Sequence, residues 1–135
     1  MKQIFLMGLL LLLPATTKIV AQTQNVDSLV KVLETGKLSN KEQMDICKQL
    51  CFEYQNNNIE KLMTYAERGL LLAKNENDKA IASDFYRYIG VGYDLYGKLD
   101  SAMVYYKKGL EWALETKNKE CEMLTYKDMA YIHIT

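Results

Sequence analysis

Apolar residues recur at helical spacing along this chain from Asn25 onward, and short polar segments separate the stretches. Apolar side chains three and four positions apart form one face of an α-helix. A short first helix is predicted at 25–35, with Gly36 as its stop. Five further helices are predicted at about 39–55, 59–74, 79–96, 99–117 and 119–135. The chain is therefore predicted to be all-α.

Polar and glycine residues at the boundaries support these helices. Ser39 stands three residues before Glu42, which is the form of a helix capping box. The run Asn56–Asn58 predicts a turn, Gly97 a helix end and Asn118 an interruption. Each predicted boundary thus coincides with residues that favour one.

The first segment has the layout of a secretory signal peptide. Lys2 precedes the apolar run Ile4–Leu13, Pro14 follows, and the small residue Ala21 stands before Gln22. The apolar run is shorter than the ~20 residues that span a bilayer. Residues 1–21 are predicted to be removed, which makes the protein exported, periplasmic or secreted. An uncleaved N-terminal anchor is the alternative.

The chain matches itself when it is shifted by about forty residues. Tyr86 then lies over Tyr126, and the pair Ile89–Gly90 lies over Met129–Ala130. Upstream, the matching pairs are Leu50–Cys51 with Ile89–Gly90 and Gly69–Leu70 with Gly109–Leu110. A fixed period of this kind indicates a repeat protein.

The segment 83–116 resembles the signature of the tetratricopeptide repeat (TPR). The resemblance lies in an apolar–small pair, an aromatic residue, a turn glycine, and a small–aromatic–small pattern on the second helix: Ile89, Gly90, Tyr93, Gly97, Leu99, Ala102, Tyr106 and Gly109. Residues 44–77 resemble a weaker copy, and 123–135 the first helix of a third. The resemblance implies antiparallel helix–turn–helix repeats stacked as a right-handed TPR solenoid over 39–135, preceded by an N-terminal helix and connector at 22–38.

Two glycines inside predicted helices need a physical reason. A glycine in mid-helix costs about 1 kcal/mol relative to alanine. Close approach of paired helices would explain Gly90 and Gly109, with Cys51, Ala102 and Ala130 as further small residues at crossings. The large tyrosines are predicted to fill the remaining core space: Tyr54, Tyr86, Tyr93 and Tyr106.

The resemblance also implies a concave groove lined by the first helix of each repeat. Six residues fall there, namely a predicted basic row of Lys48, Arg87 and Lys127 and an apolar row of Phe52, Val91 and Tyr131. Such rows would suit an extended or helical peptide with acidic and apolar side chains. The alternative is a solvated face, on which Asp45 pairs with Lys48 and Asp84 with Arg87 at i,i+3.

Three cysteines are candidates for chemistry. Cys47 and Cys51 share a helix face, so a disulfide or half of a metal site is possible by spacing, as is packing as small apolar residues. Cys121 makes the count odd, which would leave a free thiol in an exported protein. His133 cannot complete a zinc site of the usual spacing. No metal site is predicted.

Charge and motifs exclude several functions. The chain has 17 basic and 17 acidic residues, so nothing indicates a nucleic-acid or anionic-membrane partner. No nucleophile–base set and no glycine-rich phosphate loop is evident. We therefore expect no catalysis and no cofactor.

A protein- or peptide-binding scaffold in an exported protein is the function that these patterns favour. An alternative is the truncated extracytoplasmic sensor region of a membrane-bound signalling regulator. A carbohydrate-uptake lipoprotein is disfavoured because no cysteine stands at the signal cut. The last predicted helix has no partner helix after it, so Met129 and Ile132 should be exposed. This indicates either the front of a longer protein or a face for self-association.

Overall fold

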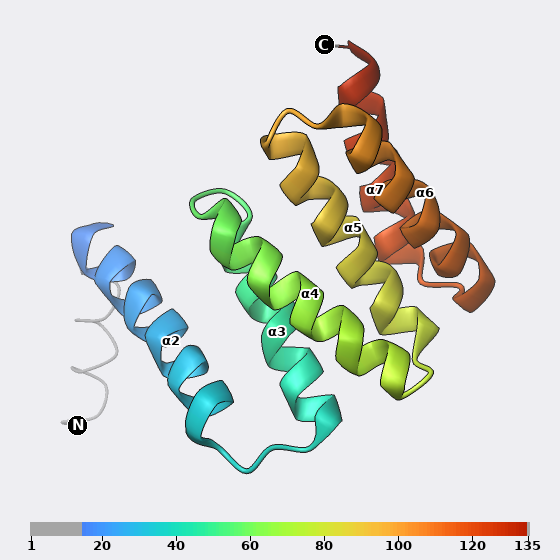
Figure 1. The fold of residues 1–135 in the computed structure, drawn as a ribbon. Coiled ribbons are helices and arrows are strands. Elements are labelled where there is room, and N and C mark those ends of the chain that lie inside the picture. Colours follow the sequence, from blue (N-terminus) through green and yellow to red (C-terminus); the bar gives the residue numbers. More distant parts are fainter. Residues whose placement is uncertain (1–14, 135) are drawn as a thin grey trace, which may run out of the picture. The chain divides into compact units, whose positions relative to one another are not determined.

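The computed structural model describes the backbone of residues 15–134 and the side chains of residues 25–132. This part of the chain is all-helical, as Figure 1 shows, with α2 at Ala15–Thr35, α3 at Asn40–Tyr54, α4 at Ile59–Asn75, α5 at Lys79–Leu95, α6 at Leu99–Thr116 and α7 at Lys119–Ile134. The chain divides after Gly36 into two units, which are described separately. The predicted all-α class is confirmed over these residues.

The first unit contains α2, which begins at Ala15 and not at Asn25 as predicted. The apolar periodicity on which the prediction rested begins later than the helix itself. The helix runs across the predicted cleavage position between Ala21 and Gln22. Residues 1–14, which hold most of the predicted signal peptide, lie outside the described residues. Among the described helices, none has the length and apolar character needed to cross a membrane.

In the second unit, side chains cap the helices where the sequence predicts that they begin. The Ser39 backbone N–H donates to Glu42 Oε2 at 2.8 Å, and the Glu42 backbone N–H donates to Ser39 Oγ at 3.2 Å, which confirms the capping box. Asn58 and Asp78 accept backbone N–H bonds at the starts of α4 and α5. These bonds satisfy N–H groups that have no partner inside the helix.

The turns between helices use left-handed backbone positions. Gly97 has a φ of 74°, a conformation that glycine adopts without steric cost, and it follows α5 as predicted. Asn77 and Lys117 also have positive φ values, 54° and 58°. Asn118 accepts a bond from the Cys121 backbone N–H at 3.2 Å and so starts α7. The predicted interruption at Asn118 is therefore a helix cap.

Successive helices of the second unit pack against one another as antiparallel neighbours, because the connections between them are short (Figure 1). The odd-numbered helices also meet, since α3 contacts α5 and α5 contacts α7. No such backbone contact joins α4 to α6 among the described helices. The array is therefore closed on the side of α3, α5 and α7 and open on the side of α4 and α6.

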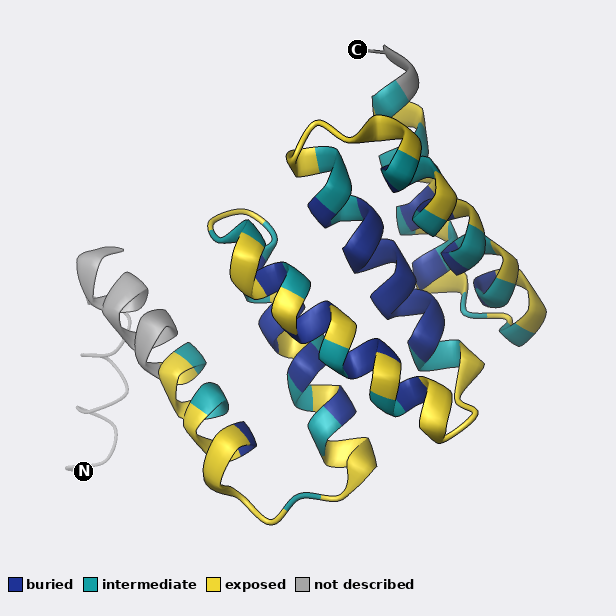
Figure 2. Ribbon diagram, viewed as in Figure 1, coloured by how far each residue is buried: buried dark blue, intermediate teal, exposed yellow. Residues whose placement is uncertain are grey.

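Helix α5 is the centre of this unit. Every residue from Ala82 to Gly90 is buried, and Figure 2 shows the helix dark blue along most of its length. Three of these buried residues are polar, namely Ser83, Asp84 and Arg87. A buried polar group costs free energy unless it has a hydrogen-bond partner. Within the described residues, no buried side-chain nitrogen or oxygen lacks one.

Glycines at the helix crossings meet their neighbours closely, as predicted. A Cβ on Gly90 would lie 2.5 Å from Cδ1 of the buried Tyr106 ring. A Cβ on Gly109 would lie 3.0 Å from the Ser83 carbonyl oxygen, so α5 and α6 approach through backbone. Ala130 departs from the prediction and is exposed, because no described helix packs over it.

Candidate functional site

The open side of the array holds a groove between α4 and α6, with α5 as its floor. We call it the α4–α6 groove, and its cavity volume is about 770 Å³. Ligand pockets in proteins commonly have volumes of ~300–1,000 Å³. The groove exists because α4 and α6 each pack on α5 but make no backbone contact with each other among the described helices.

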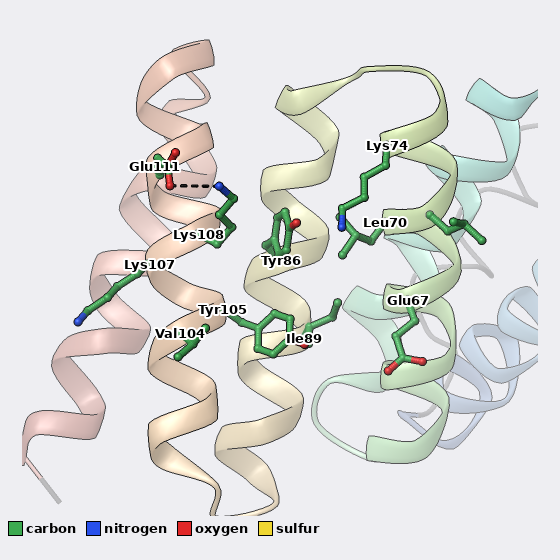
Figure 3. Close-up of a pocket in the computed structure, with 11 residues that line it drawn as sticks. Glu67, Leu70, Lys74, Tyr86, Ile89, Val104, Tyr105, Lys107, Lys108 and Glu111 are labelled. Atoms are coloured by element: carbon green, nitrogen blue, oxygen red, sulfur yellow. Dashed lines mark hydrogen bonds and ion pairs between the residues drawn. The ribbon is translucent and has the colours of Figure 1, made fainter.

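Apolar side chains from three helices line the groove. In Figure 3, Leu70 comes from α4, Tyr86 and Ile89 from α5, and Val104 and Tyr105 from α6. Leu71 of α4 also lines it. Two of these residues are largely exposed, Leu71 at 62% and Val104 at 66%. The groove therefore presents apolar surface from both walls to whatever enters it.

Aromatic rings run along one side of the groove. Tyr93 stacks on Tyr105 with centroids 5.2 Å apart, and Tyr105 lies 6.3 Å from Tyr86. Tyr86 then meets Trp112 edge-on at 5.1 Å. Such pairs contribute ~0.5–1.5 kcal/mol beyond burial, so they stabilise the packing of α6 on α5. A second pocket, lined by Tyr86 and Trp112 among others, adjoins this end with a volume of about 400 Å³.

Charged side chains stand at the rims. The Lys74 ammonium lies 5.4 Å from the centre of the Tyr86 ring, a cation–π distance. Lys108 pairs with Glu111 at 3.3 Å, so these two charges offset each other. Glu67 and Lys74 have no ion-pair partner within the part of the chain that the structure describes. The α4 wall thus carries an unpaired anion and, two turns on, an unpaired cation.

The six sequence-predicted site residues lie on the other side of the array, on α3, α5 and α7. Phe52 and Tyr131 are exposed, at 61% and 68%, and Val91 is half-buried. Lys127 is exposed and forms no ion pair within the described residues. The other two cations, Lys48 and Arg87, are engaged by carboxylates. The role of the six residues in ligand binding stays a prediction.

The ion pairs at these positions differ from the i,i+3 pairs of the solvated-face alternative. Lys48 Nζ lies 3.0 Å from Asp84 Oδ2, which ties α3 to α5. Arg87 Nη1 donates to Asp128 Oδ2 at 2.6 Å, which ties α5 to α7. Asp45 pairs with Lys41. The structure therefore does not form the i,i+3 pairs of the solvated-face alternative: Lys48 and Arg87 pair with carboxylates on neighbouring helices, and Asp45 pairs with Lys41 on its own helix.

Arg87 is the centre of a buried polar cluster. Only 7% of its side chain is exposed, and its guanidinium lies 4.6 Å from the centre of the Tyr88 ring. Burial raises the pKa of Tyr88 to about 12, against the opposing effect of Arg87. Burial, with Asp128 and Asp94 nearby, also raises the pKa of Tyr106 far above its ordinary range. Both tyrosines are therefore neutral hydrogen-bonding groups at neutral pH.

The three cysteines are buried and form no disulfide with one another. Cys47, Cys51 and Cys121 are all present as thiols, and none has measurable exposure. Among the described residues, no group of three His, Cys, Asp or Glu could hold a metal ion. The side chain of His133 lies outside the described residues. Of the alternatives weighed from the sequence, packing as small apolar residues fits these positions.

We expect the thiols to be unreactive in the folded protein. Burial raises the pKa of Cys51 well above its ordinary value and also raises that of Cys121, and the thiolate is the reactive form. Alkylation with N-ethylmaleimide at mild pH should therefore be slow in buffer and complete in urea, as read by intact mass. Rapid modification of the native protein would contradict this expectation.

Sequence reasoning missed the α4–α6 groove for a physical reason. Its outer lining comes from exposed apolar residues such as Leu71 and Val104, and a search of the sequence for core positions does not identify these. One signal was available in the run Leu70–Leu71–Leu72, because three successive leucines on a helix cannot all face one side. Leu70 is buried, whereas Leu71 is exposed on the groove.

Comparisons with known proteins complete the description of the site. A scan against protein-family models, a search of curated proteins and a search of solved structures each returned no match.

Proposed function

We propose that this chain is a non-catalytic, protein-binding scaffold of the TPR type within an exported protein. The signal-peptide pattern of the first residues supports export, and the forty-residue period supports TPR-like repeats. Successive helices pack in pairs with close crossings at glycine, and α5 also contacts α3 and α7. This arrangement is compatible with a repeat array. Binding of a protein or peptide partner would be the function of such an array.

The α4–α6 groove is the observation that carries this proposal. Exposed apolar side chains in a concave surface favour contact with another protein. The groove is lined by aliphatic and aromatic groups, which suits a peptide segment that inserts apolar side chains. Its rim charges would then orient the segment.

A photo-crosslinking residue in place of Leu71 would test the proposal in cells that produce the protein. The partner identified by mass spectrometry would then be purified and titrated against the chain. Val104→Glu should weaken this binding at least tenfold, because it places a charge in the apolar wall, and a tenfold loss corresponds to about 1.4 kcal/mol.

Leu114→Glu is the matched control. Leu114 is also exposed on α6, at 47%, but does not line the groove. Its substitution should leave partner binding unchanged. An equal loss of partner affinity in the two variants, or no loss in Val104→Glu, would contradict the assignment of partner binding to this groove.

A further inference from the structure

Helix α7 presents a second apolar surface, on the side away from α5 and α6. Cys121 and Thr125 are buried on its inner side, whereas Met123, Tyr126 and Tyr131 are exposed on its outer side. Met129 and Ile132, which the sequence predicted to be exposed, are only partly so. The exposed residues from Glu120 to Tyr131 are called the α7 face: Glu120, Met123, Tyr126, Lys127, Ala130 and Tyr131.

The charges on the α7 face match those on the groove wall in spacing. Glu120 and Lys127 are seven residues apart, as are Glu67 and Lys74 on α4. Seven residues of helix rise by about 10 Å and return to nearly the same side. None of the four has an ion-pair partner in the part of the chain that the structure describes. Each helix therefore carries an unpaired anion and cation at the same separation.

We propose that the α7 face of one copy of this chain docks in the α4–α6 groove of a second copy, with α7 antiparallel to α4. In this orientation Lys127 lies opposite Glu67, and Glu120 opposite Lys74. Met123 and Tyr126 then cover the exposed walls at Leu71 and Val104. The inference rests on the proposed function of the groove as a protein-binding site.

Helix dipoles favour the same orientation. α4 and α6 run in the same direction along the two walls, as the rise from Glu67 to Lys74 and from Val104 to Glu111 in Figure 3 shows. A helix carries partial positive charge at its N-terminus and partial negative charge at its C-terminus. A third helix antiparallel to both walls places unlike ends together. The parallel orientation would place like ends and like side-chain charges together.

The two surfaces are different patches of one molecule, so this contact is head-to-tail. Each copy offers one groove and one α7 face, and a head-to-tail contact continues from copy to copy unless it closes into a ring. Association should therefore pass beyond the dimer as concentration rises.

Sedimentation velocity of the purified full chain tests the proposal with charge reversals. Lys74→Glu places a carboxylate opposite Glu120, and Glu120→Lys places an ammonium opposite Lys74. Each variant alone should associate about tenfold more weakly, because like charges then face each other. A mixture of the two variants should recover association, since every contact between unlike copies is again between opposite charges.

Lys61→Glu is the matched control on α4. Lys61 is exposed and does not line the groove, so this variant should associate as the unsubstituted chain does. Far-UV circular dichroism checks that each variant is folded. A chain that stays monomeric at all concentrations, that stops at a dimer, or whose paired variants fail to recover association would overturn the inference. If Val104→Glu still weakens the binding of a different partner protein, the proposed function of the groove stands even though the inference of self-association fails.

Discussion

Replacement of Asp128 by alanine is expected to lower the free energy of unfolding by about 3 kcal/mol, because it leaves a buried charge without its partner. The Arg87 guanidinium is nearly inaccessible to water and bonds Asp128 Oδ2 at 2.6 Å. Burial by itself lowers the pKa of Arg87, but the nearby Asp128 carboxylate outweighs burial and raises it. Urea denaturation followed by circular dichroism would measure the loss.

Two further variants separate this effect from ordinary surface charge. Asp45→Ala removes the pair between Lys41 and Asp45, whose side chains are 82% and 51% exposed, and should cost no more than about 0.5 kcal/mol. The double variant Arg87→Met with Asp128→Leu should recover most of the lost stability, because it removes both charges. A loss from Asp128→Ala no larger than that from Asp45→Ala would contradict the importance of the buried pair.

Gly109→Ala is expected to destabilise the protein by about 2 kcal/mol, although alanine is the better helix former. A Cβ at this position would lie 3.0 Å from the Ser83 carbonyl oxygen and 3.2 Å from the Arg87 backbone nitrogen. Backbone atoms of a buried helix cannot rotate away, so α5 and α6 would have to separate. Thermal and urea denaturation would both report the loss.

Gly92→Ala gives the opposite expectation and serves as the control. Its Cβ would meet the Met63 sulfur, which belongs to a flexible and only partly buried side chain. Met63 can move aside, so the gain in helix propensity should leave stability unchanged or raise it by up to about 1 kcal/mol. A similar loss from both substitutions would show that the distinction between backbone and side-chain neighbours does not govern these sites.

The helices of the second unit could be predicted because residues close together in the sequence determine where these helices begin and end. A capping box needs only Ser39 and Glu42, three residues apart, and the turn at Gly97 needs only one residue without a side chain. Close crossings at Gly90 and Gly109 were predictable for a similar reason, since a mid-helix glycine has a cost that only packing offsets. The start of α2 was missed because its first residues lack a clear apolar period.

The site was predictable only in part, because it depends on pairs that are distant in the sequence. The partner of Arg87 is forty-one residues away at Asp128, and no local spacing distinguishes it from Asp84. The α4–α6 groove is a property of the space between two helices that have no backbone contact with each other within the described residues. Sequence periodicity identifies which side of a helix is apolar but does not fix the distance between non-neighbouring helices.

The unequal closure of the two sides has a mechanical consequence. On one side, Lys48–Asp84 and Arg87–Asp128 tie α3, α5 and α7 together, so bending that separates these helices must break ion pairs. On the other side, no backbone contact joins α4 to α6 among the described helices, so fewer interactions resist a change in the distance between them. The array is therefore softer toward the groove than away from it. A segment bound there as proposed would act as a spacer between α4 and α6 and would oppose their approach.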